Sequence, residues 1–185
     1  MRISKDNPCY YLTSVTNNRL PVFQKTKLKE IAAKALDEAR KSAEIMIFAY
    51  VIMPDHYHLL TDSSRKPSEV LRYTNGITAR RVIDYLKENQ FTSSLEKLRQ
   101  ETKMRAYKYS LWEHHPNAFS NNNEATFTQK VNYVHQNPVR SGLVEKAEDY
   151  LFSSVRIWRK CSVDDEPLTV NIDKIEWREA QPLRG

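Results

Sequence analysis

Two histidines, two residues apart, stand at the start of an apolar run near the middle of the chain. His56 and His58 follow a Pro-Asp turn signal and open the stretch His-Tyr-His-Leu-Leu. Because side chains alternate between the two faces of a strand, both imidazoles would emerge on one face and Tyr57 on the other. Two imidazoles placed in this way can bind one metal ion if a third group reaches them from elsewhere. The alternative is a pair of hydrogen-bonded structural histidines.

The elements that would position this pair alternate between strands and helices. Runs of strand-forming residues predict strands at 10–16, 45–53, 56–62 and 107–112. Helical spacing of apolar residues predicts helices at 26–39, with Thr26 as N-cap, at 67–87 and at 124–136. The order up to residue 112 is that of a ferredoxin-like split βαβ arrangement. We therefore expect an α+β fold with a central antiparallel sheet.

The last predicted helix has a core stripe formed by Phe127, Val131 and Val134. Asn121 and Glu124, three residues apart, resemble a capping box at its start. The sequence Asn137-Pro138 is expected to end it, because proline disfavours helical geometry at the preceding residue.

Tyr133 lies on this helix but outside its apolar stripe, roughly 120° from the stripe's centre at 100° per residue. Asn137, four residues later, and Lys130, three residues earlier, share its side of the helix. A tyrosine, an amide and a cation would therefore converge. From spacing alone, an ordinary half-buried tyrosine with its hydroxyl in solvent is the preferred interpretation.

The composition is that of a globular protein, with 40% hydrophobic and 28% charged residues among 185. We expect one domain over residues 1–160 and an extension, docked or weakly structured, over 161–185. The net charge of +6 favours polyanionic partners. No apolar run approaches the ~20 residues of a membrane span, and the N-terminus lacks the apolar core of a signal peptide, so we expect a cytoplasmic protein. Cys9 and Cys161 are expected to be free thiols.

Three stretches together resemble the HUH single-tyrosine transposases of bacterial insertion sequences, in particular the REP-associated tyrosine transposases. They are YVIMPDHYHLL at 50–60, YVHQNPVRSGLV at 133–144 and YLFSS at 150–154. The resemblance spans roughly residues 10 to 160.

The resemblance implies a metal-dependent transposase that cleaves and rejoins single-stranded DNA through a 5′-phosphotyrosine. It implies that His56, His58 and Asn137 hold a divalent metal ion, Mg2+ or Mn2+, with Gln136 as the fallback third ligand. It also implies that Tyr133 is the nucleophile. No nucleotide cofactor is expected, because the sequence has no P-loop.

The expected partner is single-stranded DNA that forms a hairpin, bound by a monomer or a homodimer. Such DNA requires cations for the backbone and aromatic rings on which unpaired bases stack. The candidate aromatic residues are Tyr73 and Tyr107. The candidate cations are Arg72, Arg80, Arg81, Lys103, Arg105, Lys108 and Lys130.

Two alternatives remain open at this stage. One is a DNA- or RNA-binding protein that keeps the fold of a domesticated transposase without its activity. The other is a replication or plasmid-transfer nickase with the same metal chemistry, although 185 residues leave little room for the additional elements of such enzymes.

Overall fold

A four-stranded antiparallel sheet with the strand order β2-β3-β1-β4 forms the centre of the computed structural model, which describes residues 1–100, 108–113, 117–161 and 166–177. Its strands are β1 (Cys9–Val15), β2 (Ile47–Ile52), β3 (His56–Thr61) and β4 (Asn117–Asn121). β3 lies between β1 and β2 and is antiparallel to both. This is the expected split βαβ arrangement, so the predicted α+β fold class is confirmed.

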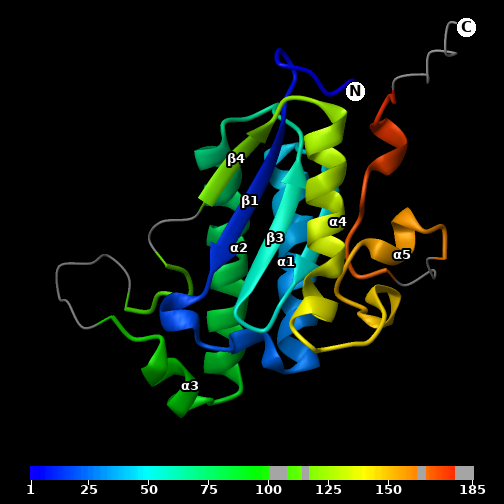
Figure 1. Cartoon of the computed structure of the whole chain (residues 1–185). Helices are drawn as coiled ribbons and strands as arrows, with labels where there is room; N and C mark the ends of the chain where they lie inside the picture. The colour runs from blue at the N-terminus through cyan, green and yellow to red at the C-terminus, as the bar shows by residue number, and fades with distance from the viewer. Residues whose placement is uncertain (101–107, 114–116, 162–165, 178–185) are drawn as a thin grey trace, which may run out of the picture.

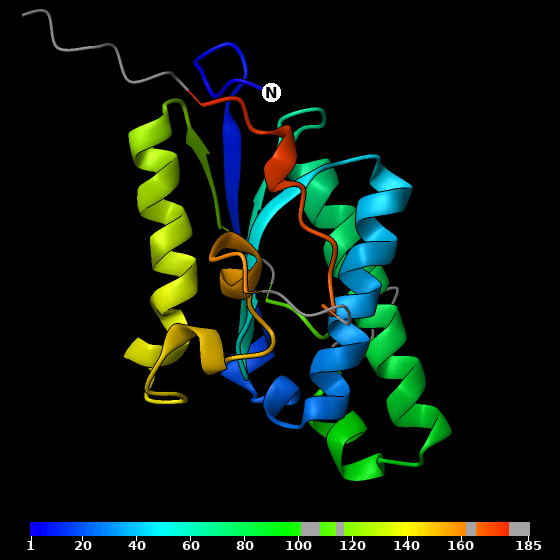
Figure 2. The ribbon, with the colours of Figure 1, turned by 90° about the vertical axis from the view of Figure 1, so that its right-hand side faces the viewer.

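Helices cover the two faces of the sheet unequally. The long helices are α1 (Thr26–Ala43), α2 (Pro67–Glu88) and α4 (Glu124–Arg140), and the short ones are α3 (Thr92–Lys97) and α5 (Val155–Trp158). Figure 1 shows α1 and α2 behind the sheet and α4 in front of it, and the turned view of Figure 2 separates the two layers. None of the described helices has the length and apolar character to cross a membrane.

The core lies mainly between the sheet and the α1/α2 layer. All six residues of β2 are buried, and so are all residues of β3 except His56. The side chain of Tyr57 is fully buried, and its hydroxyl donates a hydrogen bond of 2.9 Å to Oγ1 of Thr74 on α2. Tyr57 therefore faces α2, which leaves His56 and His58 on the α4 side of the sheet, as the strand alternation predicts.

The prediction of a fourth strand at 107–112 is wrong: residues 108–112 form no strand, and residue 107 lies outside the described residues. The fourth strand is β4, which pairs with β1 through Cys9 to Thr13. Tyr109 and Trp112 form only isolated bridges, and Trp112 is buried with its ring 5.1 Å from that of Tyr57. The aromatic residues that suggested a strand serve to pack a loop against the core instead.

The predicted end of the last helix is also wrong, because α4 continues through Pro138 to Arg140. Proline removes only its own amide, and the next turn is still closed by a 3.0 Å bond from the Ser141 amide to the Asn137 carbonyl. Arg140 thereby lies two turns beyond Tyr133, on the same side of α4.

The helix starts differ from the predicted caps. The cap of α4 is Asn123, whose side chain accepts a 2.9 Å hydrogen bond from the Thr126 amide, rather than Asn121. Asn121 is the last residue of β4. Helix α1 includes Thr26 as its first residue, and Lys25 occupies the cap position without a side-chain hydrogen bond.

The outer edge of β2 is covered by two segments from later in the chain. The Ile52 amide donates to the Phe152 carbonyl at 2.9 Å, and the Asn171 amide donates to the Ile47 carbonyl at 2.7 Å. Further along, the Glu176 amide donates to the carbonyl of Met1 at 3.0 Å. Described residues beyond position 160 therefore contact the sheet and the N-terminus, while the boundary at 160 stays a prediction.

Candidate functional site

A polar pocket of about 330 Å³ opens where β3 begins and α4 ends. It collects side chains from four separate parts of the chain: β1, the turn after it, β3 and the C-terminal half of α4. Its lining residues are Thr13, Val15, Arg19, His56, His58, Tyr133, Asn137, Arg140 and Ser141. Four residues that the sequence singled out, namely both histidines, the tyrosine and the asparagine, thus border one cavity.

The two histidines lie side by side because of their position on β3. Their ring centroids are 4.8 Å apart. In the register between β1 and β3, Thr13 lies opposite His58 and Val15 opposite His56. Paired residues of antiparallel strands share a face, so β1 supplies the adjoining wall of the pocket.

His58 is held by hydroxyl groups from β1. Its Nδ1 lies 2.9 Å from the Tyr11 hydroxyl and 2.8 Å from Oγ1 of Thr13. Burial, followed by electrostatic interaction with His56 and Lys130, lowers the pKa of His58 to about 3, so its imidazole is neutral at physiological pH. Burial also raises the pKa of Tyr11 to about 12, so its hydroxyl remains protonated.

His56 is oriented by a carboxylate. Its Nδ1 lies 2.6 Å from Oδ1 of Asp55, whose Oδ2 accepts a 3.1 Å hydrogen bond from Arg19. Metal-binding histidines commonly use one ring nitrogen for such a carboxylate or hydroxyl and the other for the ion. In both His56 and His58, Nε2 is the nitrogen left for an ion, so this pair fits a metal site.

Tyr133 projects from α4 toward the two histidines. Its ring is half-buried and lies edge-on to the His58 ring, with centroids 5.7 Å apart. The guanidinium carbon of Arg140 is 4.6 Å from the centre of the tyrosine ring, and Nζ of Lys130 is 5.9 Å from it. A phenol flanked by two cations is well placed to carry developing negative charge.

The structure distinguishes between the two amide side chains considered as third ligand. Asn137 is 8% exposed and lines the pocket, whereas Gln136 is exposed and outside it. The described residues contain no cluster of three or more His, Cys, Asp or Glu side chains able to hold a metal ion. An ion at this pocket would therefore need an oxygen such as that of Asn137 beside the two imidazoles.

Most of the candidate DNA-binding cations lie away from the pocket. Arg81 on α2 forms a bidentate ion pair with Glu38, at 2.9 and 2.7 Å, and Arg80 lies 3.9 Å from Asp84. Arg72, also on α2, borders a different groove. Lys108 is exposed beside the ring of Tyr109. Tyr73 is half-buried on α2, while Lys103, Arg105 and Tyr107 lie outside the described residues.

The sequence interpretation missed the residues that hold the histidines. Asp55 could have been found, because it is adjacent to His56 in the chain. Tyr11 and Thr13 carried a weaker signal, a two-residue spacing on a predicted strand, because only the pairing of β1 with β3 places them against His58.

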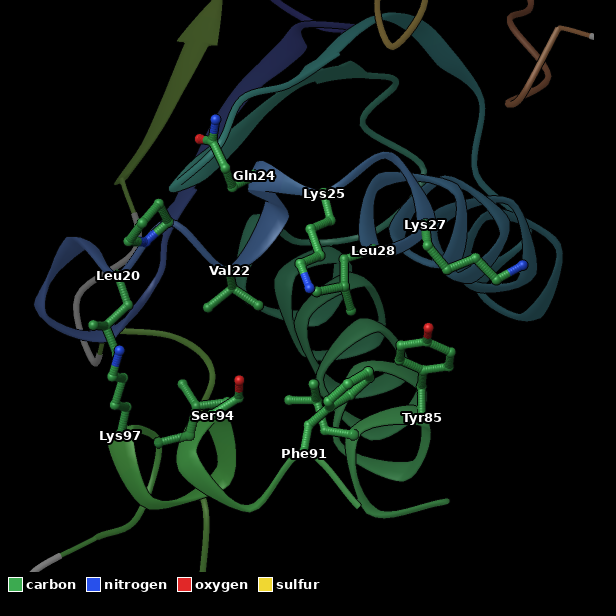
Figure 3. A pocket seen from close by; sticks show the side chains of 13 residues that line it. Leu20, Val22, Gln24, Lys25, Lys27, Leu28, Tyr85, Phe91, Ser94 and Lys97 are labelled. Carbon is green, nitrogen blue, oxygen red and sulfur yellow. The ribbon is translucent and has the colours of Figure 1, made fainter. Parts of the chain in front are cut away.

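A second hollow, of about 300 Å³, has a different character (Figure 3). It lies among α1, α2, α3 and the segment before α1, and its walls are largely apolar, with Leu28, Leu86 and Phe91 among them. Lysines contribute its charge, and its lining contains neither histidine nor carboxylate. Of the two hollows, only the polar pocket therefore contains side chains of the types that bind metal ions through imidazole nitrogen.

Solved structures with a similar fold include a REP-associated tyrosine transposase bound to a REP hairpin. The two chains superpose with a TM-score of 0.57 at 16% identity, over 92% of this chain and 89% of the other. A candidate transposase from Deinococcus radiodurans R1 matches with a TM-score of 0.44 at 21% identity, over 69% of this chain and 88% of the other. No curated protein matches the chain significantly.

The first of these likenesses places the chain in a fold class, a four-stranded antiparallel sheet with helices on both faces as seen in a tyrosine transposase. The family described as "Transposase IS200 like" matches residues 4–137. This match extends from the segment before β1 to Asn137 in the pocket. The protein belongs to the IS200-like transposase family.

Proposed function

We propose that this transposase cleaves and rejoins single-stranded DNA with Tyr133 as the nucleophile and a divalent metal ion, Mg2+ or Mn2+, at the polar pocket. The observation that carries the proposal is the convergence of His56, His58, Tyr133 and Asn137 on that one pocket. Family membership supports DNA transposition as the biological setting.

The histidine pair and the side-chain oxygen of Asn137 would hold the metal ion. When bound there, such an ion would withdraw charge from the non-bridging oxygens of the scissile phosphate. The two histidine rings are preorganised, because the Asp55 carboxylate orients the His56 ring while Tyr11 and Thr13 orient that of His58. The neutral state of His58 keeps a lone pair available over the physiological pH range.

In the cleavage step the Tyr133 oxygen attacks the phosphorus atom as the phenol loses its proton. The new bond joins the tyrosine oxygen to phosphorus, and the bond from phosphorus to the 3′ oxygen breaks. The departing 3′ oxygen takes up a proton and leaves as a hydroxyl, with the 5′ phosphate retained on the tyrosine. A phenol in water ionises only near pH 10, so the cations Arg140 and Lys130 beside the ring would stabilise the developing negative charge.

Rejoining reverses these events. A 3′ hydroxyl attacks the phosphotyrosine, forms a new phosphodiester bond and releases the Tyr133 phenol. Because the phosphotyrosine bond retains the energy of the cleaved phosphodiester, no nucleotide is hydrolysed. Retention of this bond energy distinguishes strand transfer from hydrolysis of the phosphodiester.

We propose a DNA strand with a hairpin next to the cleaved position as the substrate. A structurally similar transposase is bound to a REP hairpin, which supports this choice. The basic balance of the chain also suits a polyanion. Stem-loops from DNA flanking the gene are the appropriate first substrates.

Trapping of the covalent intermediate tests the nucleophile. The DNA carries its label at the 3′ end, because that fragment stays on the tyrosine, and the adduct is measured on a denaturing protein gel in the presence of Mn2+. We expect an adduct with the natural chain, none with Tyr133→Phe and none after chelation. Tyr73→Phe is the matched control, since Tyr73 is another half-buried tyrosine but lies on α2, in the opposite layer.

Two results would contradict the proposal. An adduct of equal yield in Tyr133→Phe would assign the nucleophile elsewhere. Hairpin binding that is indifferent to chelation, without cleavage of any flanking stem-loop, would favour a DNA-binding protein that has lost its activity.

A further inference from the structure

No helix lies in front of β1 and β4 on the α4 side of the sheet, beside the pocket (Figure 1). Helix α4 lies over the side of β2 and β3, and Figure 1 shows β1 and β4 with no helix in front of them. In the register of these two strands Phe119 of β4 pairs with Tyr11 of β1, so both side chains share the pocket's face. This surface continues directly from the wall of the pocket.

Phe119 is unusually exposed for its type. Its side chain is 56% accessible, the highest value among the exposed large apolar side chains of the described residues. An isolated exposed apolar residue is normal on protein surfaces and carries no meaning by itself. Its neighbours make this one informative.

Phe119 ends a row of rings that begins at a site histidine. The Tyr11 ring stacks on that of His58, with centroids 5.3 Å apart and an interplanar angle of 24°. The Tyr11 ring also lies 6.4 Å from the Phe119 ring, at an interplanar angle of 33°. The row leads from the pocket to solvent, and its outer ring is free to accept another flat group.

A cation lies over this row. Nζ of Lys130 is 4.8 Å from the centre of the Tyr11 ring and 5.7 Å from that of Phe119. The ion pairs among the described residues do not include Lys130. Its charge is therefore available to an anion that approaches the exposed ring.

We infer that this surface binds an unpaired nucleobase of the substrate strand next to the scissile phosphate. Phe119 stacks on the base, and Lys130 contacts the adjoining phosphate. An exposed ring combined with an unpaired cation is the combination with which proteins hold single-stranded nucleic acid, and it tolerates any base because every base has a π face. The inference rests on the proposed function, because it takes the strand in the pocket to be DNA.

The test measures binding and stacking without cleavage, in the Tyr133→Phe background. Stem-loop DNA from the gene's flanks carries 2-aminopurine at one single-stranded position at a time. We expect quenching at one position beside the cleaved bond, its loss in Phe119→Ala and its retention in Phe119→Trp. Binding by Phe119→Ala should weaken about tenfold. Phe91→Ala, which removes an exposed phenylalanine at the apolar hollow, should change neither quantity.

Lys130→Gln gives a second measurement on the same DNA. Loss of one phosphate contact should reduce the slope of log affinity against log salt by about 0.7, the value for single strands. Unchanged affinity and quenching in Phe119→Ala would overturn the inference. A change in oligomeric state alone, measured by sedimentation, would overturn it in favour of a contact with a second copy of the chain.

These outcomes separate the inference from the proposed function. Unchanged quenching and affinity in Phe119→Ala, in a protein whose natural form still yields the Tyr133 adduct, would leave the proposed function intact and reject the role of Phe119. Intact stacking in a protein that never forms the adduct would do the reverse.

Discussion

The two faces of the sheet differ in what their side chains do, and β3 contributes to both. On the α1/α2 face Tyr57 is fully buried and bonded to Thr74. On the α4 face its neighbours His56 and His58 border a polar pocket beside Tyr133. Consecutive residues of one strand thus contribute alternately to the buried core and to the polar pocket. We therefore expect substitutions on the α1/α2 face to lower the free energy of unfolding. Substitutions on the α4 face should lower activity more than stability.

The largest effect on stability is expected from Tyr57→Ala. Removing a fully buried aromatic ring should lower the free energy of unfolding by about 3–5 kcal/mol, because a cavity remains between β3 and α2. Urea unfolding followed by circular dichroism measures it. Tyr57→Phe keeps the ring and should cost only about 1–2 kcal/mol for the lost contacts of the hydroxyl with Thr74 and Asn75. If Tyr57→Ala lowered the free energy of unfolding by less than Tyr57→Phe does, the distinction between the two faces would be lost.

His58→Ala should affect chemistry more than stability. We expect the rate of adduct formation to fall more than about a hundredfold, since loss of even an outer partner of a metal ligand costs 10- to 100-fold. The free energy of unfolding should fall by about 1–3 kcal/mol, because the Tyr11 hydroxyl and Thr13 lose their partner. Single-turnover gels and urea titrations on the same preparation measure both quantities.

His135→Ala is the matched control for a buried histidine outside the pocket. Its Nε2 lies 2.9 Å from Oγ of Ser154, and it does not line the polar pocket. We expect lower stability with an unchanged adduct rate in the folded fraction. If His58→Ala behaved in the same way, the role of His58 would be structural only.

The smallest effect is expected at Asp37, a partly buried residue of α1 beside residues 166–169. Burial alone would raise the pKa of its carboxyl, but hydrogen bonds from Lys41 and Arg40 outweigh it and lower that pKa below 3.8. The unfolded chain therefore binds the proton more readily, so this contribution is present above about pH 4 and is lost as pH falls through the folded pKa. Asp37→Asn should cost less than about 1 kcal/mol at pH 7 and less still at pH 2. Thermal midpoints at both pH values measure it, and an equal difference at the two would contradict the cause given.

The sequence predicted much of the fold because its patterns are local. Alternation along β3 placed the histidines on one face, and helical spacing kept Tyr133 out of the core stripe of α4. β4 escaped prediction because its sequence, Asn-Ala-Phe-Ser-Asn, lacks an apolar alternation and four of its five residues are exposed. Its place is determined by pairing with β1, which no local pattern contains.

The candidate site likewise contains residues that could be selected from the sequence and residues that could not. His56, His58, Tyr133 and Asn137 could be selected from residue type, spacing and family resemblance, and they line one pocket. Tyr11 and Thr13 could not, because their contact with His58 depends on the register between two strands that are far apart in the chain. Arg140 was missed as a pocket residue because Pro138 was expected to end the helix before it.

The two outer strands of the sheet also bear on self-association. β2 is sealed by the chain's own later segments, so its backbone groups are already paired. β4 has no further strand against it in the described parts of the chain. Its short length and its polar residues, such as Asn117 and Ser120, disfavour pairing with a strand of another chain. Aggregation through strand addition would therefore begin at residues 117–121, and a proline or lysine substitution there should reduce it.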